Sequence, residues 1–164
     1  MKNEMEIWLD AISCNEVVAR VAVAAFVAHL NPTLEEISDI KTAVSEAVTN
    51  SIIHGYGNTF GYRKRCETKE ERSKIHPGRV NLSCKLSRGI LYIDVEDWGK
   101  GIEDVDKAME PLYTTLPEYD RSGMGFAFME AFMDDLQVIS MPGKGTLVRM
   151  QKKLTNGPWI SGEE

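Results

Sequence analysis

The clearest pattern along the chain is a helical one between Thr33 and His54. Thr33 with Glu36 three residues later is a capping-box pattern, and Gly55 supplies a stop signal. Between these limits apolar residues recur every three or four positions, which predicts a helix with one buried face. This stripe consists of Ile37, Ile40, Val44 and Val48, and Ser51 continues it.

A strand and another helix are predicted before it. Apolar and polar residues alternate over residues 5–10, which is typical of a short, half-buried strand. Ser13 with Glu16 is a second capping-box pattern, and the apolar residues that follow it up to Leu30 predict a helix that ends before Pro32.

The second half of the chain predicts two hairpins and two short helices. The expected ranges are strands 80–86 and 91–95, helices 105–109 and 123–135, and strands 136–141 and 146–154. Helices combined with antiparallel hairpins indicate an α+β sandwich. We expect one domain over residues 1–154, with a long basic loop at 57–79, a lid-like segment at 111–122 and a disordered tail at 155–164.

Composition and charge narrow the class of protein. The 164 residues are 43% apolar and 27% charged, which suits a single globular domain. The net charge of −6 argues against a nucleic-acid surface, and no apolar stretch approaches the roughly 20 residues of a membrane span. Cys14, Cys66 and Cys84 lack metal-ligand spacing, so we expect neither zinc nor a disulfide scaffold, and a reducing cytoplasm.

Three polar residues of the helix at 33–54 are the first candidates for chemistry. Glu46, Asn50 and His54 are spaced four apart, so they fall on one ridge. At about 100° per residue, Glu46 lies about 180° from Ile37, so this ridge faces away from the apolar stripe. A solvated helix face is the alternative interpretation.

Glycine-rich motifs add further candidates. Residues 97–101, Asp-Trp-Gly-Lys-Gly, follow a strand, where the carboxylate could accept a hydrogen bond from an adenine amino group. Residues 122–125, Ser-Gly-Met-Gly, lie where a loop enters a helix, and backbone N–H groups there can bind phosphates. Each motif, like Gly-Lys-Gly-Thr at 143–146, is by itself also compatible with a simple turn.

Taken in order, these motifs resemble the ATP-binding superfamily of gyrase, heat-shock chaperone, histidine kinase and mismatch-repair ATPases. Within it, the chain resembles the sporulation anti-sigma F factor family of bacterial serine protein kinases over about residues 1–154. The segments that carry this resemblance are 1–5, 41–42, 44–50, 52–56, 114–115 and 121–126. The resemblance implies the Bergerat ATP-binding fold, in which helices cover one face of a mixed, mostly antiparallel sheet.

The resemblance also implies ATP and Mg²⁺ as cofactors and assigns roles to residues. Glu46 is the catalytic base, Asn50 the magnesium ligand and Asp97 the reader of adenine, with Thr146 supporting the adenine pocket. The residues that hold the nucleotide are Gly99, Gly101, Thr114, Thr115, Ser122, Gly123, Met124 and Gly125.

Two residues near this set keep two interpretations each. Arg121 either offsets charge on the γ-phosphate or is an exposed arginine of the lid. His54 either lines the nucleotide pocket or caps its helix, where a cation is favourable, and we favour the cap.

The implied partners are a sigma factor and a small anti-anti-sigma protein that is phosphorylated on serine. Arg20 occupies the position that contacts both, although by itself it is only a polar residue in an apolar helix. A homodimer through the N-terminal part is also implied.

Loop 57–79 is longer than in the family by about 16 residues, a change that surface loops tolerate. The alternative functions are a nucleotide-dependent binding module without kinase activity and a simple ATP hydrolase.

Overall fold

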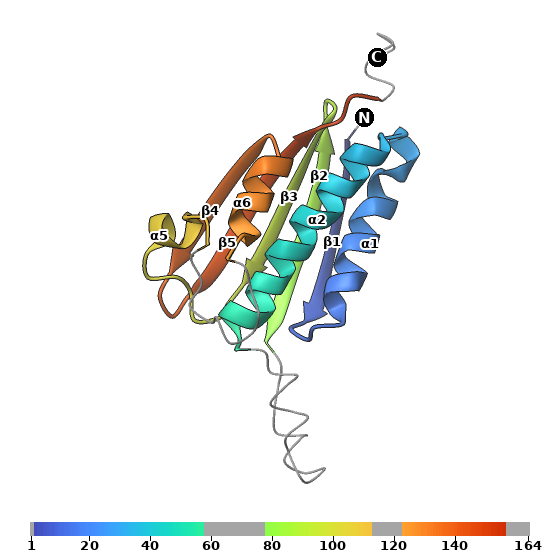
Figure 1. Cartoon of the computed structure of the whole chain (residues 1–164). Helices are drawn as coiled ribbons and strands as arrows, with labels where there is room; N and C mark the ends of the chain where they lie inside the picture. The colour runs from blue at the N-terminus through green and yellow to red at the C-terminus, as the bar shows by residue number, and fades with distance from the viewer. Residues whose placement is uncertain (1, 58–77, 113–122, 157–164) are drawn as a thin grey trace.

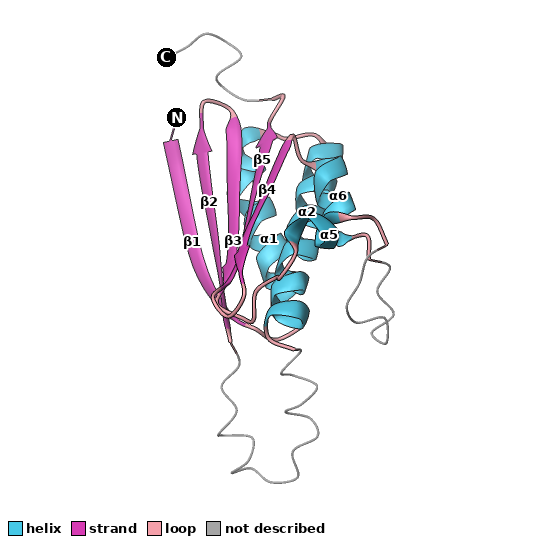
Figure 2. Cartoon of the chain, turned by 90° about the vertical axis from the view of Figure 1, so that its left-hand side faces the viewer, coloured by secondary structure: helices cyan, strands magenta, loops and turns pink. Residues whose placement is uncertain are grey.

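A computed structural model describes residues 2–57, 78–112 and 123–156 of the chain. A five-stranded sheet in the order β1-β2-β3-β5-β4 carries all the helices on one face, as Figures 1 and 2 show. The strands are β1 Lys2–Asp10, β2 Arg79–Ser87, β3 Ile90–Asp97, β4 Asp135–Met141 and β5 Gly145–Lys153. The helices are α1 Asn15–Val27, α2 Leu34–Asn50, α5 Val105–Met109 and α6 Gly125–Phe132.

The expected α+β architecture is confirmed. All four strand pairings among the described residues are antiparallel, so no parallel pair accompanies them. Side chains alternate across the sheet, and one set packs beneath the helices. Residues of that set include Leu82, Val95 and Val148, which stand side by side on β2, β3 and β5. The core therefore lies between the helices and this single sheet face.

The buried stripe of α2 faces this core as the sequence predicts. Ile40, Val44 and Val48 are fully buried, and Ile37 packs at the edge of the cluster.

None of the helices in the described part of the chain is long and apolar enough to cross a membrane. Burial raises the pKa of Cys84 to about 12, so this free thiol stays protonated at neutral pH.

One of the two predicted capping boxes is correct and the other is wrong. Thr33 caps α2 as expected, since Glu36 N donates to Thr33 Oγ1 at 3.1 Å and Thr33 N donates to Glu36 Oε2 at 2.7 Å. Helix α1 instead has Cys14 at its N-cap, without a side-chain capping bond. Glu16 accepts a hydrogen bond from Ser45 on α2, so it joins the two helices.

Element limits also differ from the prediction at several points. Strand β1 begins three residues earlier than position 5, and α6 ends at Phe132 rather than 135. After Leu30 and its 3₁₀ turn, α2 runs to Asn50 and then becomes a π-helical turn, Ser51–Gly55. Most of loop 57–79, most of the lid-like segment and all but two residues of the tail lie outside the described residues.

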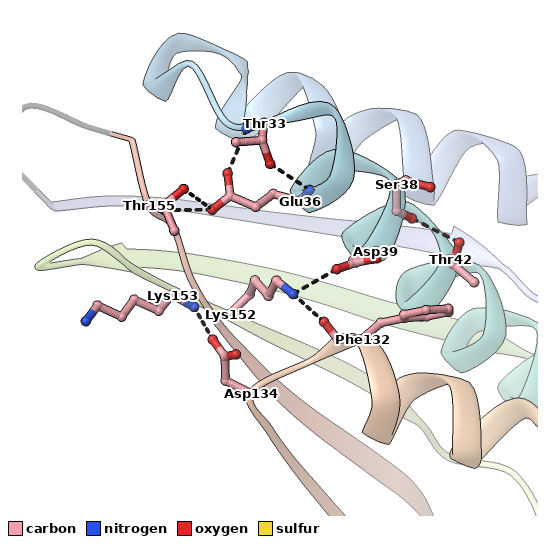
Figure 3. Close-up of polar contacts among 10 residues, drawn as sticks. All are labelled: Thr33, Glu36, Ser38, Asp39, Thr42, Phe132, Asp134, Lys152, Lys153 and Thr155. Carbon is pink, nitrogen blue, oxygen red and sulfur yellow. Dashed lines mark hydrogen bonds and ion pairs between the residues drawn. The ribbon is translucent and has the colours of Figure 1, made fainter.

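A cluster of polar contacts fastens the end of β5 to the start of α2, as Figure 3 shows. Glu36 Oε1 accepts hydrogen bonds from Thr155 N at 2.7 Å and from Thr155 Oγ1 at 2.9 Å. Burial alone would raise the pKa of Glu36, but these bonds and those to Thr33 outweigh it and hold the pKa below its ordinary value. Glu36 is therefore stabilising in its ionised form.

We expect Glu36→Gln to lower the free energy of unfolding at pH 7 by about 1–2 kcal/mol, because the helix loses a capping partner and Thr155 an anionic acceptor. The pKa of Glu36 is lower in the folded protein than in the unfolded protein, where it is near 4.5, so the Glu36 carboxylate stabilises the fold fully above pH 4.5. This stabilisation is lost as the pH falls through the folded-state pKa. Denaturant unfolding at several pH values should show the difference between the proteins closing below pH 4.5. Glu35→Gln, at an exposed site in the same turn, is the control and should change little. A difference independent of pH would contradict the role of the charge.

Candidate nucleotide site

Two residues of the predicted trio meet the start of α6. A Cβ placed on Gly125 would lie 3.0 Å from Glu46 Oε2 and 3.3 Å from Asn50 Nδ2. Gly125 is the first residue of α6, where backbone N–H groups are not used by the helix. The structure thus brings a carboxylate, an amide and a helix N-terminus together, and a side chain at Gly125 would crowd them.

The third member of the trio has a different setting. His54 lies in the π-helical turn that follows Asn50, half-buried in the last turn before Gly55. A π-turn bonds residues five apart and is wider than an α-turn. Glu46 and Asn50 lie on the regular α-helical part of α2, and His54 lies on the wider turn that follows it.

Asp97 ends β3 on the helix-facing side of the sheet and is 3% exposed. Its Oδ1 accepts a hydrogen bond from Gly99 N at 2.9 Å, and the carboxyl also receives bonds from the Ser51 hydroxyl and the Thr146 backbone. Burial raises the pKa of Asp97 above its ordinary value, and these bonds offset the rise only in part. A carboxylate has about four acceptor positions, so three bonds leave room for one donor from a ligand.

The end of the trio's helix is fastened to the turn after β3. Lys100 N donates to Gly55 O at 3.0 Å. A Cβ on Gly99 would lie 2.3 Å from that same oxygen, and a Cβ on Gly55 would lie 2.9 Å from Asp97 Oδ1. Both positions require glycine because no side chain fits between these segments.

The turn between β4 and β5 closes the same region. Ser140 Oγ donates to Gly145 O at 2.9 Å, lies 2.8 Å from Thr146 Oγ1 and accepts from Ile102 N at 2.8 Å. Gly101, with a φ of +72°, lies against this turn, where a Cβ would come within 2.1 Å of Met141 O. Thr146 is thus fixed beside Asp97, its partner across the strands.

Three contributing residues were not identified from the sequence. Ser51 was assigned to the apolar stripe but bonds Asp97, and Ser140 organises the β4–β5 turn. Tyr56 OH donates to Arg79 O at 2.7 Å and accepts from Trp98 N at 2.8 Å. The pKa of Tyr56 is raised, mainly because the residue is buried, so its hydroxyl keeps its proton. Ser51 had a usable signal, since a serine in a buried stripe needs a partner.

The remaining predicted residues divide into three groups. Gly123, with a φ of +67°, and Met124, the N-cap of α6, lead directly into Gly125. Arg20 lies on α1, where its NH1 is 3.4 Å from Glu16 Oε1. Thr114, Thr115, Arg121 and Ser122 lie outside the described residues.

The donor set fits a nucleotide with magnesium. A buried acceptor at Asp97 suits an adenine amino group, and the start of α6 suits phosphate oxygens. The described residues contain no group of three or more acidic, histidine or cysteine side chains that could hold a metal. Magnesium keeps several waters and shares phosphate oxygens, so the Asn50 amide is the ligand we predict.

A family model described as "Histidine kinase-like ATPase domain" matches residues 13–152. The relatives include an "Anti-sigma F factor" of Clostridium botulinum (strain Eklund 17B / Type B), 53% identical over 152 residues that cover 93% of this chain and 95% of the relative. An "Anti-sigma F factor" of Bacillus subtilis (strain 168) is 47% identical over 155 residues, 94% of this chain and 95% of the relative.

Two solved structures share the fold. The structure of the RsbU and RsbW domains of Rv1364c from Mycobacterium tuberculosis has a TM-score of 0.61 and 19% identity, over 94% of this chain and 33% of that one. The histidine kinase domain of the Erythrobacter litoralis EL346 blue-light activated histidine kinase has a TM-score of 0.52 and 20% identity, over 88% of this chain and 64% of that one. At these identities they bear on the fold alone. The relatives of high identity and the family model together show that the chain belongs to the anti-sigma F factor family and contains a histidine kinase-like ATPase domain.

Proposed function

We propose that this protein is an ATP- and magnesium-dependent serine kinase that also binds a sigma factor and blocks its activity. The observation that carries the proposal is the meeting of Glu46 and Asn50 at Gly125, together with the buried Asp97 carboxylate, which bonds Ser51 next to Asn50. Phosphoryl transfer requires mainly positioning and charge neutralisation, which these groups can supply.

Each residue has a distinct part in the proposed reaction. When bound, Mg·ATP would supply the γ-phosphoryl group and would leave as Mg·ADP after the transfer. Asp97 would accept a hydrogen bond from the adenine amino group, and Asn50 would offer its amide oxygen to the metal. Glu46 accepts the proton of the attacking serine hydroxyl. The serine oxygen forms the new bond to phosphorus as the bond to the β-phosphate oxygen breaks. Glu46 is half-buried at the α6 N-terminus, where a proton acceptor can reach a docked serine.

The proposed partners are a sigma factor, as the names of the relatives suggest, and a small anti-anti-sigma protein that carries the serine substrate. The outer face of α1 supports partner binding, because Val17, Val18 and Val21 are 45–54% exposed there, next to Arg20. A homodimer in the cytoplasm, without direct nucleic-acid or membrane contact, completes the proposal.

Incubation with γ-labelled ATP, Mg²⁺ and candidate anti-anti-sigma proteins tests the kinase activity. We expect label on one serine of the partner, located by mass spectrometry, and none when Mg²⁺ is chelated. Release of labelled phosphate without any labelled partner would favour the simple ATP hydrolase instead. Nucleotide binding without either product would favour the binding module.

Co-purification with sigma factors tests the second activity. We expect a sigma factor to be retained with ATP and retained less with no nucleotide. Arg20→Ala should weaken retention without changing nucleotide affinity, since Arg20 lies on α1 and forms its ion pair with Glu16 of the same helix. If no sigma factor is retained in either condition, the anti-sigma proposal fails and the kinase proposal is unaffected.

A further inference from the structure

Lys152 joins three elements at the end of the molecule opposite to the site. Its Nζ donates to Asp39 Oδ2 of α2 at 2.9 Å and to Phe132 O, the last residue of α6, at 2.6 Å, as Figure 3 shows. The side chains of Lys152 and Asp39 are only 14% and 19% exposed. A largely buried ammonium group thus links β5, α2 and α6.

This link differs from the other ion pairs of the described residues. Those pairs join residues one turn apart in α1, or residues on neighbouring strands. The pair between Lys152 and Asp39 crosses from the sheet to the helix layer. The turn after α6 is held separately, since Asp134 N donates to Gln151 O at 2.9 Å and Asp134 Oδ2 accepts from Lys153 N at 2.6 Å. Those bonds tie α6 to β5 but make no contact with α2.

The two ends of α6 meet α2 at matched positions. Phe132 is held to Asp39 through Lys152, and Gly125 lies against Glu46. Seven residues separate the two contacts on each helix, which is about 10 Å at about 1.5 Å per residue. The helices are therefore antiparallel, and fixing one contact fixes the other.

The chemistry of the link makes it resistant to sliding. The carbonyl of Phe132 is one of the last four of α6, which have no partner within the helix, and a cation is favourable there. Moving α6 along α2 by one turn would separate the ammonium from the carbonyl or from the Asp39 carboxylate. A largely buried charge left without its partner is strongly unfavourable.

We propose that Lys152 is a positioning residue that fixes the axial register of α6 against α2 and so places the α6 N-terminus against Glu46 and Asn50. The proposal rests on the proposed function only in that the α6 N-terminus receives the phosphates of a nucleotide. Adenine, at Asp97, lies outside the reach of this link, because Asp97 ends β3 and is held by other bonds.

The test compares Lys152→Met with Lys153→Met, which removes an adjacent charge from an exposed side chain. The first readout is the amide resonance of Gly125 in ¹⁵N-glycine-labelled protein without nucleotide, with Gly99 as an internal reference. The second is the affinity for Mg·ATP and for adenosine by calorimetry. We expect Lys152→Met to shift Gly125 but not Gly99 and to weaken Mg·ATP binding about tenfold, since small misplacements at a phosphate site are costly. Adenosine affinity should be unchanged, and Lys153→Met should match the parent protein.

Further variants distinguish an effect of Lys152 on the register of α6 from an effect on stability alone and from a failure of the proposed function. Lys152→Arg keeps the charge and should restore the Gly125 resonance, and Asp39→Asn, which keeps the shape of the partner, should shift it if Lys152→Met fails to fold. A lower thermal midpoint with Gly125 unmoved in Lys152→Met, or in Asp39→Asn, would overturn the proposal. If the parent protein bound neither Mg·ATP nor adenosine, the proposed function would fail, and the Gly125 resonance would still decide the register.

Discussion

Replacing Glu46 with glutamine is expected to slow phosphate transfer to a serine substrate by about 10²- to 10⁴-fold, the usual contribution of a general base. The amide has nearly the same shape as the carboxylate and keeps its place beside Gly125, but it cannot take up the hydroxyl proton. Affinity for Mg·ATP should remain close to that of the parent protein, because the predicted contacts to adenine and metal belong to Asp97 and Asn50. Single-turnover transfer from labelled ATP measures the rate, and calorimetry measures the affinity.

Glu130→Gln is the matched control, since it makes the same chemical change at an exposed position of α6. It should leave both transfer and binding unchanged. Transfer at the parent rate by Glu46→Gln would show that the base lies elsewhere. Loss of Mg·ATP binding in that variant would instead assign Glu46 to ligand binding. The transfer rate and the affinity can both be measured on the same preparation of the variant.

The elements that the sequence predicts correctly are those determined by local pattern. The stripe of α2 repeats every three or four residues, and the Thr33 capping box closes within one turn, so both need no knowledge of the rest of the chain. The same holds for the hairpin of β2 and β3, where alternation continues on both sides of a short turn. The ridge of Glu46 and Asn50 belongs to this class.

Features set by distant contacts could not be predicted in the same way. Ser13 and Cys14 both stand before α1, but the N-cap is Cys14, and Glu16 accepts a hydrogen bond from Ser45 of another helix. The π-turn after Asn50 coincides with the bonds of Ser51 to Asp97 and of Gly55 to Lys100, which join it to the end of β3. A periodicity analysis of one helix contains no information about such bonds.

The arrangement of the site depends on glycines, which allow other segments to pack closely against their backbone, as much as on its polar side chains. Gly55, Gly99 and Gly125 each lie where a methyl group would meet another segment of the site. In the sequence these glycines indicate only turns or phosphate-binding loops. The fold is needed to show which other segment packs against each of them. Among the described glycines, the one whose added Cβ would come closest to backbone is the first residue of β5.

The second large effect is expected at this position, Gly145. Gly145→Ala should lower the free energy of unfolding by about 3–5 kcal/mol, from backbone strain and overpacking together. Gly145 has a φ of +106°, a conformation that residues with a side chain rarely adopt, and a Cβ there would lie 1.9 Å from Asp97 O. The clash is with backbone, so no side chain can rotate away from it.

Gly143→Ala, in the turn directly before β5, separates the two causes. Gly143 also has a positive φ, +73°, but nothing lies within 4 Å of a Cβ placed there, so only strain remains and the expected cost is about 1 kcal/mol. Denaturant unfolding of both variants gives the comparison. Gly145→Ala should also weaken Mg·ATP binding, because the Asp97 backbone must move away from the added methyl group, whereas Gly143→Ala should leave the affinity unchanged. Equal losses of stability in the two variants would mean that strain alone acts at Gly145, and that its contact with Asp97 does not hold the adenine end of the site in place.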